Sequence, residues 1–285
     1  METAATLVPL EPAFVSVTYG AGGGTRDRTL SVVKAMKNSL GLEAMAHLTC
    51  VGSTIPGVRG ILAELKEAGI ENLLALRGDP PRGLTAGLAT SDELRYGADL
   101  VEVVRDAGGL CIGAACYPET HIEAVDSASD LRHLREKVEA GVDFLITQLF
   151  FNNEAYFVFV ERARAAGIDI PIIPGIMPIT NAEQIARFTN MCGATIPTKL
   201  LIELERRAAE PEAVLDLGVA YATLQCVDLL AAGAPAIHFY TLNKSPASKA
   251  VVSALLAARP WERPAGRRYV DHFDAVVGLP MASRD

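Results

Sequence analysis

Residues 73–81 read Leu-Leu-Ala-Leu-Arg-Gly-Asp-Pro-Pro, an apolar run that ends at a charged pair around a glycine. Four consecutive apolar residues are typical of a strand that is buried on both faces. Proline cannot continue such a strand, so Arg77, Gly78 and Asp79 are expected on the loop at its carboxyl end. Ligands of parallel α/β folds bind at that edge, which makes Asp79 the first candidate for chemistry. A salt bridge that caps the next helix is the simpler alternative.

The same alternation of apolar and amphipathic segments extends along most of the chain. Apolar or β-branched runs predict seven strands, at residues 13–19, 43–50, 72–77, 110–116, 143–148, 170–175 and 236–242. Helices are predicted at residues 3–8, from about 28, and at 55–68, 92–107, 124–140, 154–166, 182–191, 211–232 and 245–256. Strands that alternate with helices predict an α/β fold with one parallel sheet, which at this length closes as a (β/α)8 barrel of the TIM type.

The barrel is expected to span residues 1–258 with seven recognisable strands, and residues 259–285 an irregular, proline- and arginine-rich extension. One strand of eight is missing, and its expected place is before Met1. An incomplete barrel edge is compatible with a homo-oligomer.

Composition narrows the functional classes. The chain has 285 residues, a net charge of -8 and 50% hydrophobic residues, a normal globular profile. Nucleic acid and anionic membranes are disfavoured as partners because both require a basic surface. No uninterrupted apolar run of membrane-spanning length and no signal-peptide pattern is apparent, so a cytoplasmic protein is predicted. The five cysteines show no Cys-x-x-Cys spacing, which argues against disulfides and a zinc site.

Polar residues at the carboxyl ends of the predicted strands should converge on one mouth of the barrel. They are hydrogen-bonding rather than metal-binding in character, and comprise Thr18, Tyr19, His47, Thr49, Arg77, Asp79, Tyr117, His121, Thr147, Gln148 and Tyr240 to Lys244. His47, His121 and His238 lack any accompanying metal motif, so no metal is predicted. The glycine run at residues 20–24 has Thr25 where a dinucleotide fingerprint needs glycine, so a Rossmann site is not predicted. The Gln148 amide suits a pterin or flavin edge, or simply buried backbone groups.

Seven motifs, in order, resemble the methylenetetrahydrofolate reductase family from about Pro12 to Lys244. They are Phe-Val-Ser-Val-Thr-Tyr-Gly-Ala-Gly-Gly (14–23), Ala-His-Leu-Thr-Cys (46–50), Leu-Arg-Gly-Asp-Pro-Pro (76–81), Tyr-Pro-Glu-Thr-His (117–121), Ile-Thr-Gln-Leu-Phe-Phe (146–151), Pro-Gly-Ile-Met-Pro-Ile (174–179) and His-Phe-Tyr-Thr-Leu-Asn (238–243). The resemblance implies a barrel that holds FAD at its mouth, with NADH or NADPH and the folate using the same flavin face in turn. It places the protein in one-carbon metabolism and methionine biosynthesis.

The resemblance also implies a set of site residues. Those expected to contact FAD are Thr18, His47, Leu76, Arg77, Gly78, Asp79, Tyr96, Ala98, Tyr117, His121, Asp130 and Lys137. Arg77 and Lys137 would supply cations for the pyrophosphate. Those expected to bind the folate are Gln148, Gln184, Phe188 and Lys244. Asp79, Gln148 and Phe188 are the residues expected at the reacting groups, with Asp79 beside flavin and pterin and Phe188 stacked on nicotinamide or on the folate's aminobenzoyl ring.

The implied reaction passes hydride from nicotinamide to the flavin and then to the methylene carbon of the folate. The second transfer needs an acid, because the five-membered ring must open to an iminium first. In the family this acid is the glutamate of a Phe-Glu-Phe-Phe-Pro-Pro motif, which this sequence does not contain. Lys244 stands where the family more often has arginine, so charge is kept but bidentate geometry is lost.

Three explanations of the missing glutamate stay open. The sequence begins too late, or another carboxylate such as Asp271 or Asp274 supplies the proton, or the chain is a flavin- and folate-binding relative or subunit without reductase activity. In the second case, residues 275–279 are expected to cover the sheet edge left by the absent strand. A flavin-free, folate-dependent methyl-transferring enzyme on the same barrel is the further alternative.

Overall fold

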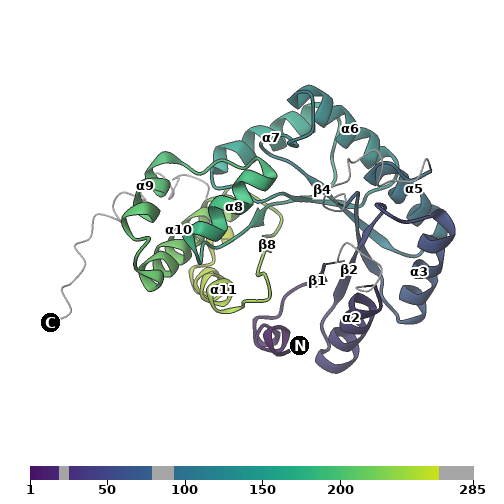
Figure 1. Ribbon diagram of the computed structural model, residues 1–285, viewed down its shortest axis with the longest axis horizontal. Helices are drawn as coiled ribbons and strands as arrows, with labels where there is room; N and C mark the ends of the chain where they lie inside the picture. The colour runs from purple at the N-terminus through teal and green to yellow at the C-terminus, as the bar shows by residue number, and fades with distance from the viewer. Residues whose placement is uncertain (19–25, 79–92, 263–285) are drawn as a thin grey trace. The chain divides into compact units, whose positions relative to one another are not determined.

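The computed structural model of the protein describes residues 1–18, 26–78 and 93–262 (Figure 1). Asp79, the glycine run, Asp271, Asp274 and the segment predicted to cover the sheet edge lie outside these residues. The described helices and strands are α1 (Glu2–Ala5), η1 (Val8–Leu10), β1 (Val15–Val17), α2 (Arg26–Leu40), β2 (Ala44–Thr49), α3 (Ile55–Glu67), β3 (Asn72–Leu76), α5 (Gly97–Ala107), β4 (Cys111–Cys116), α6 (Ser127–Glu139), β5 (Phe144–Thr147), α7 (Asn153–Ala165), β6 (Ile172–Ile173), β7 (Gly175–Ile176), α8 (Ala182–Cys192), α9 (Thr198–Arg206), α10 (Pro211–Ala231), β8 (His238–Phe239), α11 (Pro246–Ala258) and η3 (Pro260–Glu262).

The strands confirm the predicted parallel α/β fold. Six of them form one sheet in the order β1-β2-β3-β4-β5-β6, and β7 and β8 form a second pair. Pairing is parallel along β1 to β4, with His47 opposite Leu74 and Ala75 opposite Ala114. The strand predicted at residues 170–175 is instead two short strands, β6 and β7, separated by Pro174. Proline has no N–H for a ladder, which explains the break.

The chain divides into two compact units. Unit 1 comprises residues 1–116, 125–146 and 163–171, and unit 2 comprises residues 117–124, 147–162 and 172–285. The sequence-based expectation of one barrel domain over residues 1–258 stays a prediction.

In unit 1, β2 and β3 are buried on both faces, as their continuous apolar runs predicted. Ala44 to Ala46 and Leu73 to Ala75 are each at most 5% exposed. Helices α2, α3, α5 and α6 cover the outer face of this part of the sheet (Figure 1). Helix α3 shows the pattern most clearly, because Thr54 caps its first turn and Val58, Leu62 and Leu65 face inward at helical spacing.

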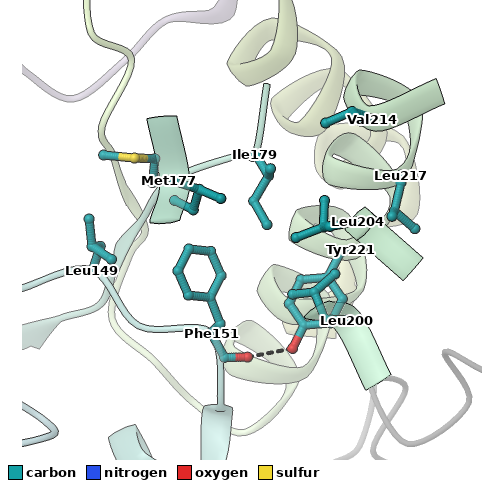
Figure 2. Packing of buried hydrophobic residues seen from close by; sticks show 10 residues of the cluster. Leu149, Phe151, Met177, Ile179, Leu200, Leu204, Val214, Leu217 and Tyr221 are labelled. Atoms are coloured by element: carbon teal, nitrogen blue, oxygen red, sulfur yellow. Dashed lines mark hydrogen bonds between the residues drawn. The ribbon is translucent and has the colours of Figure 1, made fainter. Parts of the chain in front are cut away.

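In unit 2, the core forms around α10 and the segment that follows β5. Phe151, Ile179, Leu204, Leu217 and Tyr221 pack together in this cluster (Figure 2). The Tyr221 hydroxyl donates to the backbone oxygen of Phe151, and the Gln225 amide donates to that of Phe150 at 3.0 Å. These two bonds attach the segment after Gln148 to α10.

Two helices of unit 2 differ from what the sequence predicted. Helix α9 was not predicted, although Leu200 and Leu204 are buried at the spacing of one helical turn. Helix α10 is, by length and composition alone, apolar enough to cross a membrane, and half of its most apolar window is buried. The sequence-based prediction was that no uninterrupted apolar run reaches membrane-spanning length. In α10, Asp216 and Asp228 interrupt the apolar residues. A core helix of a soluble protein passes the same test, so this finding is weak evidence for a membrane.

Candidate functional site

The carboxyl end of β3 meets the amino end of α5 in unit 1. A side chain added at Gly97, the first residue of α5, would come within 3.6 Å of the backbone nitrogen of Arg77 and 3.8 Å of Cδ of Lys137. The Asp99 carboxylate accepts from the backbone N–H groups of Arg95 and Tyr96, at 2.7 Å each, and fixes this helix end. The amino end of α5, the side chain of Lys137 and the backbone of Arg77 therefore meet at Gly97. A helix amino end beside a lysine suits an anion.

Lys137 projects from the last turn of α6 toward the end of β4. Its ammonium donates to the backbone oxygen of Ala115 at 2.7 Å. Burial lowers the pKa of Lys137, and the neighbouring Cys116 and Asp130 oppose that shift. The cation is thus held half-buried by its own chain, with part of its hydration already removed.

Arg77 and Gly78, the first two residues after β3, pack closely against the end of β2. Gly78 has φ +85°, which favours glycine. A side chain added there would also lie only 2.9 Å from Cβ of Thr49, so there is no room for one. The backbone oxygen of Arg77 accepts from the N–H of Val51 at 2.9 Å and from the Cys50 thiol at 3.3 Å. This packing fixes where the chain leaves β3, immediately before Asp79.

The other predicted flavin residues of unit 1 lie on β2 or at strand and helix ends. His47 lies on β2 in register with β3, Thr18 follows β1, Leu76 ends β3, Ala98 is in the first turn of α5, and Asp130 is in the first turn of α6. Tyr96 precedes α5 and is 63% exposed. Asp79 lies outside the residues described.

Unit 2 carries the loop with Tyr117 and His121. The two rings meet edge to face, with centroids 4.5 Å apart and planes at 86°. Nδ1 of His121 accepts from the backbone N–H of Glu123 at 3.1 Å, which leaves Nε2 as the nitrogen available to carry the proton of the neutral ring. Aromatic rings attract each other in this edge-to-face geometry, which favours the arrangement in which the two rings lie side by side.

A pocket in unit 2 brings together three of the four predicted folate residues. Gln184, Phe188 and Lys244 line a small pocket that is partly open to solvent. The amino ends of α8 and α11 contribute Asn181 and Ser248 to its wall. The Asn181 side chain accepts from the N–H of Gln184 at 2.7 Å and caps α8, and the Arg187 guanidinium lies 5.7 Å from the centre of the Phe188 ring.

Gln148, the fourth predicted folate residue, does not line this pocket. Its side-chain oxygen accepts from the N–H of Leu149 at 2.8 Å. Tyr240 links the two places, because its ring lines the pocket and its hydroxyl donates to the backbone oxygen of Thr147 at 2.7 Å. Gly175 permits this approach, since a side chain there would lie 2.6 Å from the Tyr240 ring.

Sequence reasoning missed several pocket residues. Thr180, Asn181 and Ser248 were not singled out, although an Asn three residues before Gln184 is a helix-cap signal. Among residues 1–18, 26–78 and 93–262, no group of three His, Cys, Asp or Glu side chains could hold a metal ion.

His238 should make the stability of the protein depend on pH. Burial lowers the pKa of His238 from 6.5 to about 4, and its ring packs edge to face on Tyr240. The unfolded chain therefore takes up a proton first as the pH falls below 6.5, and His238 should cost about 2 kcal/mol of stability between pH 7 and pH 5. Urea unfolding at both pH values measures the loss. His238→Gln should remove this part of it, whereas the exposed His133→Gln should not. An equal loss in all three proteins would contradict the assignment.

The fold defines a parallel α/β protein of the barrel type, and each of its two units carries candidate polar residues of its own. The chain belongs to the methylenetetrahydrofolate reductase family, whose model matches residues 1–256. It is 40% identical to the 5,10-methylenetetrahydrofolate reductase of Salmonella typhimurium and 39% identical to that of Escherichia coli, each over 87% of this chain and 82% of the relative. These matches confirm the resemblance inferred from the seven motifs.

Relatives in plants are longer. The chain is 36% identical to methylenetetrahydrofolate reductase (NADH) 1 of Arabidopsis thaliana over 91% of its own length, but spans only 47% of that protein. Among solved structures, an uncharacterized protein from Clostridium thermocellum that binds two copies of 5-methyl-5,6,7,8-tetrahydrofolic acid matches with a TM-score of 0.52 and 14% identity, over 89% of this chain and 98% of that one. At this identity the match supports the fold alone.

Proposed function

We propose that the protein reduces 5,10-methylenetetrahydrofolate to 5-methyltetrahydrofolate, using NADH or NADPH and FAD. The observation that carries the proposal is the unit 2 pocket, in which Gln184, Phe188 and Lys244 lie together in a chain of this family. Family membership supports the reaction class, and the pocket supplies residues suited to a folate. The cytoplasmic location and the absence of a nucleic-acid or membrane partner belong to the same proposal.

Each pocket residue would contact a different chemical group of the folate. The Gln184 amide can both donate to and accept from a pterin or amide edge. The Phe188 ring offers an apolar face for the aminobenzoyl group, and Lys244, which precedes α11, offers a positive charge for the carboxylates. Asn181 and Tyr240 hold the walls of the pocket in place.

The residues of unit 1 fit the phosphates of FAD. Cδ of Lys137 and the backbone nitrogen of Arg77 lie beside Gly97 at the amino end of α5. A cation and a helix amino end are donors that suit a pyrophosphate, and the Arg77 guanidinium would add a second charge. Lys137 would bind one phosphate, and the half-buried position of its ammonium strengthens that contact because little water competes.

When bound, FAD supplies a hydride acceptor and donor that no amino-acid side chain provides. The protein's part is to bind and orient. Phe188 and Gln184 would hold the folate, Tyr117 and His121 would present their paired rings to the cofactor, and Lys137 would neutralise phosphate charge. The ring-opening step still needs a proton donor, and the printed sequence lacks the family's Phe-Glu-Phe-Phe-Pro-Pro motif.

Anaerobic flavin spectroscopy on the purified protein reconstituted with FAD tests the proposal. NADH or NADPH should bleach the visible flavin absorbance, and 5,10-methylenetetrahydrofolate should restore it. Bleaching without restoration would favour the alternative of a flavin- and folate-binding relative without reductase activity, since the missing motif acts in that second step. Protein that binds no FAD would contradict the proposal and favour the flavin-free methyl-transferring alternative.

A pair of lysine variants serves as the matched control. Lys244→Met should raise the folate concentration needed for half-maximal restoration, because it removes the charge at the pocket. Lys249→Met removes an exposed lysine from the first turn of α11 and should change nothing. Bleaching by NADH should be equal in both.

A further inference from the structure

The loop that carries Tyr117 and His121 contains a strained residue. Thr120 has φ +75°, in the left-handed region that β-branched residues rarely adopt. Its N–H donates to the backbone oxygen of Tyr117 at 3.2 Å, which closes a tight turn just before His121. Such a conformation persists only where surrounding contacts hold it.

Glu119 makes the contact that holds this turn. Both of its carboxylate oxygens accept from the backbone N–H of Thr195, at 3.1 and 3.2 Å, and one also accepts from the Thr195 hydroxyl. Hydrogen bonds to an ionised carboxylate are about twice as strong as neutral ones. A single side chain, adjacent to the strained residue, is therefore tied to a segment 76 residues away in sequence.

Thr195 lies in the connection between α8 and α9, and α8 carries Gln184 and Phe188. The same two segments also lie close together at Gly193, where an added side chain would come within 3.8 Å of Cβ of Ile122. The loop with Tyr117 and His121 and the helix that lines the pocket are thus packed together within unit 2.

We propose that Glu119 is a positioning residue, which holds the Tyr117–His121 ring pair in place through its contact with Thr195 and ties that loop to α8. The inference rests on the proposed function, since it assigns the ring pair to FAD and α8 to the folate. Neither sequence reasoning nor the family resemblance singled out Glu119.

The physical consequence follows from the strain at Thr120. Without the carboxylate, Thr120 relaxes to an ordinary negative φ, and the turn that sets His121 against Tyr117 opens. FAD then has to restore the turn on binding, so its affinity falls by about ten-fold. Glycine at position 120 adopts the positive φ without strain, so it should restore much of the affinity even when Glu119 is absent.

Four variants test the proposal. Glu119→Ala removes the contact, Glu119→Gln keeps one acceptor oxygen, Glu119→Ala with Thr120→Gly relieves the strain, and Glu161→Ala removes an exposed carboxylate elsewhere in unit 2 as a control. FAD affinity is measured by quenching of flavin fluorescence. Amide hydrogen exchange at Thr195, measured without FAD, reports the contact itself, and thermal unfolding verifies that each variant folds.

The expected order is specific to positioning. Glu119→Ala should bind FAD about ten-fold more weakly, Glu119→Gln should fall between it and the parent, and the double variant should return to within about three-fold of the parent. Thr195 exchange should accelerate in Glu119→Ala and in the double variant alike. Unchanged FAD affinity or unchanged Thr195 exchange in a folded Glu119→Ala protein would overturn the proposal, as would a double variant that recovers nothing.

The exchange measurement separates this inference from the proposed function. A parent protein that binds no FAD overturns the proposed function and with it the assignment of the ring pair to that cofactor. The Glu119–Thr195 contact is then still decided by hydrogen exchange alone.

Discussion

Replacing Gly218 with alanine is expected to destabilise the protein by roughly 3 kcal/mol or more, because overpacking against backbone cannot be relieved by a rotamer change. Gly218 is a buried residue of α10, and a side chain added there would lie 1.8 Å from the backbone oxygen of Ile179. The segment that contains Ile179 forms one wall of the unit 2 pocket. The helix or the wall must move, so folate binding should weaken together with stability.

Gly60→Ala is the matched control for this prediction. Gly60 lies in the interior of α3, is exposed, and has nothing within 4 Å of an added side chain. Alanine there should stabilise the protein by up to about 1 kcal/mol, since it is the better helix former. Urea unfolding of the two variants measures both effects. Equal stabilities of Gly218→Ala and Gly60→Ala would show that α10 does not approach Ile179 as closely as the structure places it.

Replacing Lys137 with methionine is expected to lower FAD affinity by roughly 10- to 100-fold, the value of a hydrogen bond to a charged group. Methionine keeps most of the volume of the side chain that lies beside Gly97 but removes the ammonium and its bond to Ala115. Titration of apoprotein with FAD, followed by fluorescence quenching, measures the loss. The affinity should also become less dependent on salt, because one phosphate contact is gone.

Arg135→Met provides the control on the same helix. The Arg135 side chain is half exposed and pairs with Glu139 at 3.1 Å on the surface of α6. Arg135→Met changes the net charge of the protein by the same amount as Lys137→Met, so any effect of overall charge is the same in both variants. Equal FAD affinities of the Lys137 and Arg135 variants would remove Lys137 from the phosphate site.

The parallel fold could be predicted from the sequence because a strand that is buried on both faces appears as a continuous apolar run. The runs Leu73 to Leu76 and Ala44 to Ala46 are continuous, and the structure buries Leu73 to Ala75 and Ala44 to Ala46. Boundaries were less predictable, as the division of residues 170–175 at Pro174 shows. Helix α9 could have been found from Leu200 and Leu204, but a nine-residue helix leaves a weak periodic signal.

The candidate site was predictable in part. Gln184, Phe188 and Lys244 were named from their motifs, and the structure brings them into one pocket, whereas Gln148 bonds to its own neighbour instead. Glu119 was not found, because its role depends on Thr195, which is 76 residues distant. Gly218 looked like an ordinary helix residue, since only the close approach of Ile179 makes a side chain impossible there.

The sequence by itself determined the parallel α/β fold, the family and the chemical types at the strand ends, because periodicity and ordered motifs are properties of neighbouring residues. Only the tertiary structure decided which of those residues share a pocket, that α5 and Lys137 meet at Gly97, and that Glu119, next to the strained Thr120, bonds to Thr195. These facts depend on distances between segments far apart in the chain, which local sequence patterns do not encode.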